Sequence, residues 1–282
     1  MIRIITLVEN TTSTTKYQCK HGLCLYIETT KHKILFDLGQ DDLFIENAKK
    51  LNVDISEIDT VIISHGHKDH GGALKHFLRL NSKAKIYIRK EAFEPHYIKV
   101  FGLPFNVGLN NELSLSNQII FTDEETIIDE ELCLFSNVKN EKYILNANKV
   151  LYAKKDGQLI SDDFSHEQNL IITADGTKTL FAGCSHAGIA NIQNKAEKLI
   201  SNGIDFVIGG FHLYNPPTRK YESNEIICRL ANDLKEKGSV YYTCHCTGRK
   251  AYEQMKEVIG KRLHYLSTGE EIWLQYKESD SK

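Results

Sequence analysis

A dense group of metal-binding side chains directly after a short apolar strand restricts the fold more than any other feature of this sequence. Residues 60–64 are apolar or β-branched and carry no charge, which predicts a buried central strand. Four ligand-type residues then occupy six positions: His65, His67, Asp69 and His70. Two histidines two positions apart at a strand end project to one side and can share a metal ion, and the next turn can hold a second ion nearby. Gly71 and Gly72 then allow close backbone packing where a helix begins.

The same arrangement recurs along the chain, because strand-then-helix units appear in both halves and the strands end on histidines. These residues are His65 and His67, His186, His212, and His245. In open α/β sheets, ligands bind beyond the carboxyl ends of the strands, so histidines there converge on one cleft. Histidine is also the commonest metal ligand, and the chain has 12. Core packing does not explain this pattern.

Hydrophobic periodicity predicts the other elements around these units. Strands are expected at 2–8, 24–28, 33–36, 85–88, 119–122, 132–136, 169–173, 179–182, 206–209, 240–243 and 271–275. Helices are expected at 41–51, 73–80, 190–201, 223–237 and 249–259. Between about 90 and 160, aromatic residues and proline mix with glycine and asparagine, which indicates an insertion or lid. We therefore expect a single domain over 1–282, with a frayed tail at 277–282.

Composition excludes several classes of protein. The chain has 35 Lys and Arg against 37 Asp and Glu, a net charge of -2, so it has no overall basic field for nucleic acid or an anionic membrane. No apolar run approaches the ~18–20 residues of a membrane span, and the first residues look like a strand rather than a signal peptide. The odd number of cysteines, 7, favours reduced thiols in a cytoplasmic protein.

The His-x-His-x-Asp-His pattern resembles the signature of the metallo-β-lactamase superfamily, and the resemblance extends over most of the chain. It implies an α/β fold, the αββα sandwich, with two sheets face to face, helices outside, and each half of the chain giving one sheet. It also implies two divalent metal ions at the sheet edge, zinc in the first place, with manganese or iron as the other candidates. Asp69 would then be both a metal ligand and the catalytic carboxylate.

The remaining site residues follow from the same resemblance. Asp37, in a stretch like the family's first motif, would support the ligand imidazoles through hydrogen bonds. His245 fits the terminal ligand. The family's bridging aspartate is replaced by Cys184, and either Cys184 or His186 can fill that position, with His186 favoured. His166 is a further candidate for a missing family histidine.

Four more residues are candidates for binding a substrate or a metal ion. His212 could be a ligand, a phosphate donor or a proton carrier, and His21 has a similar standing. Ser185 and Thr247 lie at expected helix starts, where free N–H groups bind anions.

More narrowly, several stretches resemble a dihydropteroate-synthase-like or ribofuranosylaminobenzene-phosphate-synthase-like subgroup of the superfamily. They are Val8-Glu9-Asn10, His21-Gly22, Glu167-Gln168, residues 183–188, residues 209–213 and residues 245–248. The first hypothesis is a metal-dependent hydrolase of a small anionic, phosphorylated substrate. The alternatives are a transferase or synthase in a pterin or folate-like pathway, an iron redox protein of the same fold, and a non-enzymatic metal-binding module.

Overall fold

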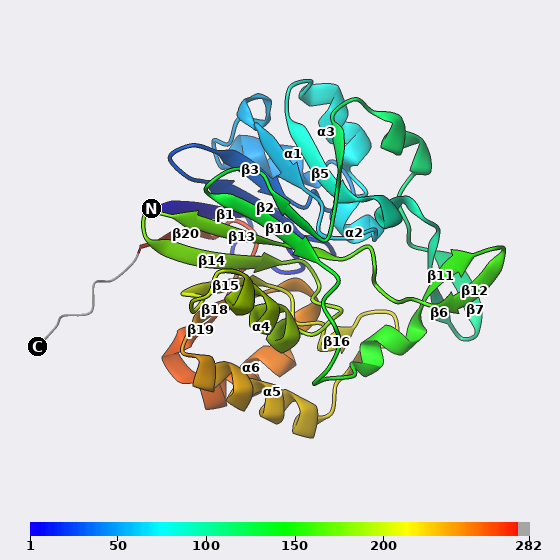
Figure 1. Cartoon of the computed structure of the whole chain (residues 1–282), viewed down its shortest axis with the longest axis vertical. Coiled ribbons are helices and arrows are strands. Elements are labelled where there is room, and N and C mark those ends of the chain that lie inside the picture. Colours follow the sequence, from blue (N-terminus) through cyan, green and yellow to red (C-terminus); the bar gives the residue numbers. More distant parts are fainter. Residues whose placement is uncertain (276–282) are drawn as a thin grey trace, which may run out of the picture.

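The computed structural model describes residues 1–275 and contains two seven-stranded sheets that lie face to face (Figure 1). The strands of the first sheet are, in spatial order, β20 (Glu271–Leu274), β1 (Ile2–Val8), β2 (Cys24–Glu28), β3 (Lys33–Phe36), β4 (Thr60–Ile62), β5 (Lys85–Arg89) and β8 (Ile119–Thr122). Those of the second are β19 (Leu263–Tyr265), β18 (Val240–Thr243), β15 (Phe206–Gly209), β14 (Thr177–Ala182), β13 (Gln168–Ala174), β10 (Leu132–Ser136) and β9 (Glu125–Ile127). The expected tail at 277–282 lies outside the described residues.

Helices cover the outer face of each sheet. The helices are α1 (Leu43–Lys50), α2 (Lys68–Gly71) and α3 (Leu74–Leu80) on the side of the first sheet, and α4 (Ile189–Leu199), α5 (Asn224–Lys237) and α6 (Arg249–Ile259) on the side of the second (Figure 1). The ends of α5 show why it forms where predicted, since the Ser223 side chain accepts from the Ile226 N–H and Gly238 takes a left-handed conformation after the last turn. Among the described residues no helix is long and apolar enough to cross a membrane.

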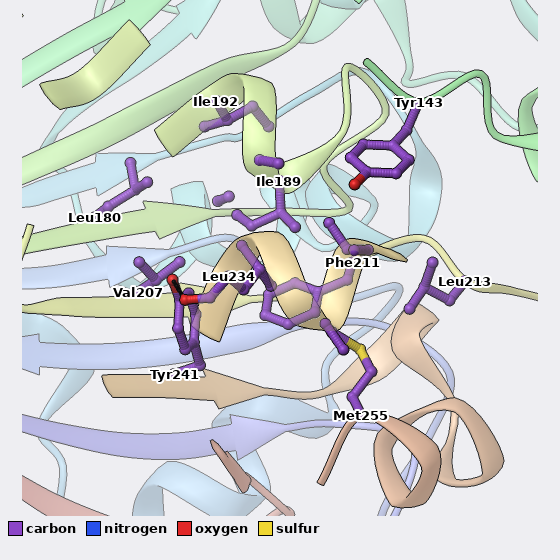
Figure 2. Packing of buried hydrophobic residues seen from close by; sticks show 14 of the residues in the cluster. Tyr143, Leu180, Ile189, Ile192, Val207, Phe211, Leu213, Leu234, Tyr241 and Met255 are labelled. Atoms are coloured by element: carbon purple, nitrogen blue, oxygen red, sulfur yellow. Dashed lines mark hydrogen bonds between the residues drawn. The ribbon is translucent and has the colours of Figure 1, made fainter. Parts of the chain in front are cut away.

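Three apolar layers hold the sandwich together. One lies between the first sheet and α1 and α3, one between the two sheets, and one between the second sheet and α4, α5 and α6. Figure 2 shows the third layer, in which Phe211, Tyr241 and Met255 pack together. Between the sheets, the Phe36 and Phe181 rings meet with centroids 5.9 Å apart. The four-layer αββα architecture expected from the sequence is therefore confirmed.

The parallel strands of both sheets bring their carboxyl ends to one edge. β3, β4 and β5 are parallel neighbours, and so are β14, β15 and β18. Their carboxyl ends lead into the loops that carry the conspicuous histidines of the sequence, so the fold gathers these loops from distant parts of the chain.

The segment from 90 to 160 is not one continuous insertion. Residues at its two ends form a separate four-stranded sheet, in the order β12 (Gln158–Ser161), β11 (Leu151–Lys155), β6 (His96–Val100) and β7 (Leu103–Asn106), which projects from the sandwich (Figure 1). Its middle belongs to the sandwich, since β8 joins the first sheet while β9 and β10 join the second. The expectation that each half of the chain gives one sheet is also wrong in detail, because β20 returns to pair with β1. A two-stranded ladder, β16 (Tyr214–Asn215) with β17 (Lys220–Tyr221), completes the fold.

The inter-sheet layer gives a direct test of this architecture. Replacing Phe181, fully buried against Phe36, by alanine should lower the free energy of unfolding by about 3–5 kcal/mol, because the cavity left behind adds to the lost burial. The same substitution at Ile127, which is 78% exposed, should change the free energy of unfolding by less than about 0.5 kcal/mol. Urea unfolding of the metal-free protein measures both, and equal effects of the two substitutions would contradict the assignment of the core.

Candidate metal centre

Four residues at the carboxyl ends of parallel strands adopt a left-handed backbone conformation that disfavours non-glycine residues. They are Asp37 after β3 (φ 59°), Ser185 after β14 (φ 61°), His212 after β15 (φ 51°) and His245 after β18 (φ 50°). Such strain costs of order 1–3 kcal/mol per residue and persists only where the surroundings enforce it, typically at functional sites. The sharp turns redirect the chain so that side chains from both sheets face one another.

Asp37 fixes the orientation of two imidazoles from the histidine motif. Its Oδ2 accepts from His70 Nδ1 (2.6 Å) and from the Ser64 hydroxyl (2.7 Å), and its Oδ1 accepts from the Ser64 N–H (2.7 Å). Because the Ser64 hydroxyl donates to Asp37, it accepts from His65 Nδ1 at 2.9 Å. Both rings therefore have Nδ1 engaged, and Nε2 is left facing the interior of the site. The supporting role expected for Asp37 agrees with these contacts.

Asparagine side chains orient the other two imidazoles in the same way. His245 Nδ1 donates to Asn10 Oδ1 (2.9 Å), which also accepts from the Gly22 N–H. His186 Nδ1 donates to Asn148 Oδ1 (3.0 Å), whose amide group in turn donates to the His186 carbonyl. Four imidazoles, from the three segments that follow β4, β14 and β18, thus present Nε2 inward, which is the orientation that metal-binding histidines adopt.

The inward-facing atoms stand at the spacing of ligands on a common ion. Ligand atoms bonded at ~2.0–2.3 Å to a tetrahedral zinc ion lie about 3.3–3.8 Å apart. His65 Nε2 lies 3.4 Å from His186 Nε2, and His70 Nε2 lies 3.2 Å from His245 Nε2. Burial, with the neighbouring imidazoles, holds the pKa of both His65 and His186 well below its usual value, so both are neutral and able to bind a cation. The donor set therefore fits the divalent ions expected from the sequence.

Cys184 stands between these two pairs of histidines. Its Sγ lies 3.2 Å from His70 Nε2, and it falls within 4.8 Å of the ligand nitrogens of both the His65–His186 pair and the His70–His245 pair. Burial raises the pKa of the Cys184 thiol, so a neighbouring cation is needed to hold it as a thiolate. The sequence posed Cys184 and His186 as alternatives, and the structure brings both into the cluster.

Asp69 links the cluster to the surface through His21. Its Oδ2 lies 3.3 Å from His245 Nε2 and 3.1 Å from His21 Nε2, and the His21 side chain is 41% exposed. Although burial opposes ionisation, His70, His21 and His245 hold the pKa of Asp69 well below its usual range. In the opposite direction, Asp69 overcomes burial and raises the pKa of His21.

His67 and His166 occupy different positions from one another, although both adjoin His65. The His67 ring contacts those of His65 and His186, with centroids 4.7 and 5.0 Å apart, and its buried Nε2 has no hydrogen-bond partner within residues 1–275. His166 is turned away, since its Nδ1 accepts from the Gly66 N–H (3.0 Å) and its Nε2 faces Asp162. His166 therefore holds the backbone between His65 and His67 in place. It stands apart from the His65–His186 pair, in a separate buried group of ligand-type side chains with His67, His96 and Asp162.

Ser185 and Thr247 do not face the site, contrary to the expectation that they bind an anionic substrate group. Both are fully buried, the Ser185 hydroxyl donates to the Gly210 carbonyl (2.6 Å), and Thr247 Oγ1 accepts from the Phe211 N–H (2.9 Å). Their hydroxyls tie the strand-end loops together. His212 does face the site, where its ring packs on that of His186 with centroids 4.2 Å apart.

Two buried glutamates anchor the ligand loops, and the sequence alone did not reveal their roles. Glu9 Oε1 accepts from the His245 N–H (2.7 Å), and Glu167 accepts from the His186 and Ala187 N–H groups (2.6 and 3.0 Å). Burial raises the pKa of Glu167 to about 7 despite these hydrogen bonds. An ionisable residue at the end of an apolar strand, as at Val8-Glu9, is the signal that could have identified the first of them.

A cavity of about 490 Å³ opens onto the cluster. His67, Asp69, Cys184, His186, His212 and His245 line its base. Its walls are mostly apolar and come from the projecting sheet and the loop after β15: Ile98, Val107, Leu151, Tyr214, Pro216 and Pro217. Lys68 and His21 add positive or titratable groups to the lining. The cluster is thus accessible to a small molecule.

Comparisons with known proteins show which proteins this chain is similar to. The family model of the metallo-beta-lactamase superfamily matches residues 18–135. The crystal structure of Tm1679, described as a metal-dependent hydrolase of the beta-lactamase superfamily, superposes with a TM-score of 0.84 at 27% identity, over 98% of this chain and 100% of that one.

Two relatives from Methanocaldococcus jannaschii are similar over nearly the whole chain. One is the 7,8-dihydropterin-6-methyl-4-(beta-D-ribofuranosyl)-aminobenzene-5'-phosphate synthase, which is 28% identical over 96% of each chain. The other, an uncharacterized protein, MJ0448, is 28% identical over 92% of this chain and 94% of its own.

Metal binding should release protons in a pH-dependent way. Burial disfavours the charged form of His70, but Asp37 and Asp69 outweigh it and raise its pKa to about 9. His70 therefore carries a proton on Nε2 at pH 7 in the metal-free protein, and a cation must displace it. Titration calorimetry with zinc in buffers of different ionisation enthalpy should show proton release that falls as the pH rises through about 9. Release that is constant from pH 7 to 10 would contradict this role of His70.

Asp37→Asn should weaken zinc binding by about 10–100-fold, because its amide group would face the Nδ1–H of His70, donor against donor. Chelator competition measures the dissociation constant. Asp123→Asn, at an exposed position, is the matched control and should bind zinc as the native protein does. Equal affinity of the Asp37 variant and the control would show that this carboxylate does not orient the ligands.

Proposed function

We propose that this chain, whose residues 18–135 match the family model of the metallo-beta-lactamase superfamily, is a metal-dependent hydrolase of a small anionic, phosphorylated molecule. One observation carries the proposal: the Nε2 atoms of His65 and His186 lie 3.4 Å apart and those of His70 and His245 lie 3.2 Å apart, with the Cys184 sulfur within 4.8 Å of both pairs. Such a cluster at the base of an open cavity suits catalysis better than a closed structural site, which leaves no position for a substrate.

In this proposal two divalent ions are held by the predicted ligands. His65, His67 and His186 would hold one ion, and Asp69, His70 and His245 would hold the other, with Cys184 close enough to contribute to either. When bound, such ions lower the pKa of water and polarise the oxygen of a phosphoester. Neutral imidazoles, a carboxylate and a thiolate are the ligands that zinc accepts, and zinc is therefore the first candidate.

Asp69 and His21 provide a route for the proton released from the attacking water. Asp69 has too low a pKa to hold a proton at neutral pH, so it orients the water by accepting a hydrogen bond. His21, 3.1 Å from Asp69 and partly exposed, can pass a proton to solvent. In this arrangement the first residue orients the water and the second carries the proton away.

The lining of the cavity selects the substrate class. An anionic group is drawn to the base by the cations and by Lys68 at the cavity surface. The apolar walls, which include Ile98, Leu151 and Tyr214, suit an organic body that carries that group. The balanced overall charge is compatible with this local attraction.

A synthase acting on a phosphorylated ribosyl-aminobenzene is the second candidate. It is favoured by the named synthase from Methanocaldococcus jannaschii, which matches 96% of this chain. The two candidates differ in what stabilises the metal-loaded protein. A synthase of this type should be stabilised against heat by a dihydropterin, whereas a simple phosphoesterase should respond only to phosphate esters.

Activity measurements test the first proposal. The zinc- or manganese-loaded protein should hydrolyse members of a panel of phosphomonoesters, phosphodiesters and lactones, and a chelator should abolish turnover. Asp69→Asn should lower kcat by about 100-fold or more at saturating metal, since water is no longer oriented by a carboxylate. Asp123→Asn is again the control. The hydrolase proposal fails if the loaded protein hydrolyses nothing in the panel, or if Asp69→Asn matches the native rate.

A further inference from the structure

A second group of ligand-type side chains lies in the cavity wall beside the histidine cluster. It consists of Cys184, Cys246 and His212, which follow the parallel strands β14, β18 and β15. One ligand atom of each lies within 4.8 Å of the others, and all three residues are buried and line the cavity. Only Cys184 belongs to the centre already described, so Cys246 and His212 have no role there.

The His212 imidazole lacks the partners that the neighbouring histidines have. The residue is only 7% exposed, yet neither ring nitrogen has a hydrogen-bond partner within residues 1–275. Buried polar groups are nearly always satisfied, so one that is not satisfied needs an explanation. A histidine of ordinary core packing would direct a nitrogen at a carbonyl or hydroxyl group, as His65, His186 and His245 do. In His212 neither nitrogen makes a hydrogen bond of good geometry to any residue from 1 to 275, and the side chain that interacts with this ring is Cys246.

The chain accommodates the Cys246 sulfur closely. Sγ accepts the backbone N–H of His212 at 3.3 Å and donates to the Cys184 carbonyl at 3.5 Å. The backbone of Gly210 packs against the Cys246 sulfur, and a Cβ atom added at Gly210 would lie 2.5 Å from Sγ. A cysteine that served only as a small apolar side chain would need neither an N–H group that donates to its sulfur nor a glycine beside it. The backbone of His212 therefore fixes the position of the Cys246 sulfur beside the His212 ring.

We propose that Cys184, Cys246 and His212 bind a third cation, a thiophilic divalent ion of the zinc type, with its fourth position open to the cavity. Two thiolates and one imidazole form a soft ligand set that selects such ions. The three ligand atoms lie within 4.8 Å of one another, so small side-chain rotations suffice to bring them to the spacing of a zinc tetrahedron. Cys184 would connect this ion to the histidine centre, because a thiolate sulfur has three lone pairs and can bind more than one cation.

The proposal rests on the histidine centre only through the shared residue Cys184. An ion in the cavity wall with an open position would bind an oxygen of the substrate's anionic group. The third ion would thus act in substrate binding, whereas the histidine centre acts at the reacting bond.

Cadmium binding to the reduced, metal-free protein tests the proposal without any activity assay. Cadmium ions bound per chain are counted by elemental analysis, and thiolate ligation is followed by the ultraviolet thiolate-to-cadmium absorption. The variants are Cys246→Ser and His212→Gln, with Cys228→Ser at an exposed cysteine as the matched control. Circular dichroism of each variant verifies that it is folded.

The native protein and Cys228→Ser should bind three cadmium ions, and Cys246→Ser should bind two with about half of the thiolate absorption. His212→Gln should retain both thiolates but bind the third ion at least about tenfold more weakly. Native-like stoichiometry and absorption in Cys246→Ser would overturn the proposal. The difference between native and Cys246→Ser tests the third site, whereas the number of ions that Cys246→Ser retains tests the histidine centre, so the two failures are distinguishable.

Discussion

The hydrogen bonds of Asp37 are the interaction on which the rest of the site depends. This fully buried carboxylate at the end of β3 accepts three hydrogen bonds, two from Ser64 and one from His70. Burying a carboxylate without hydrogen-bond partners would cost much free energy. The three hydrogen bonds remove this cost, so the protein is stable only when Ser64 and His70 lie where they can donate to Asp37. Through the Ser64 hydroxyl, Asp37 also fixes the orientation of the His65 ring. A single carboxylate therefore determines which nitrogen of each of the two imidazoles faces the cavity. Asp37 adopts a strained left-handed backbone conformation in this position, and its hydrogen bonds offset the cost of that strain.

The second sheet repeats the same principle with different residues. Glu9 and Asn10 fix the backbone and the ring of His245, and Glu167 and Asn148 do so for His186. Each ligand loop therefore has one acceptor that fixes its backbone and one that fixes its imidazole. Since the loops follow parallel strands of a sandwich with three packed apolar layers, the ligand atoms are positioned by the rigid part of the fold.

The features that the sequence predicted correctly are those that depend on residues close together in the chain. The motif from His65 to His70, the hairpin of β13 and β14, and helices α5 and α6 follow from patterns within a few positions. Contacts across long separations did not: His245 and Glu9 are 236 positions apart, and no periodicity indicates that they meet. The segment from 90 to 160 was misjudged for the same reason, because its strands pair with partners from distant parts of both sheets. Ser185 and Thr247 were misjudged because a hydroxyl near a helix start can bind an anion or a carbonyl, and only the fold decides which.

Anomalous diffraction at the zinc edge from crystals of the zinc-loaded protein tests the central claim most directly. The account predicts one zinc ion bound by His65 and His186 and another bound by His70 and His245, with the Cys184 sulfur between them. Zinc peaks only elsewhere in the molecule, or a map in which the Nε2 atoms of these four histidines bind no metal, would contradict it.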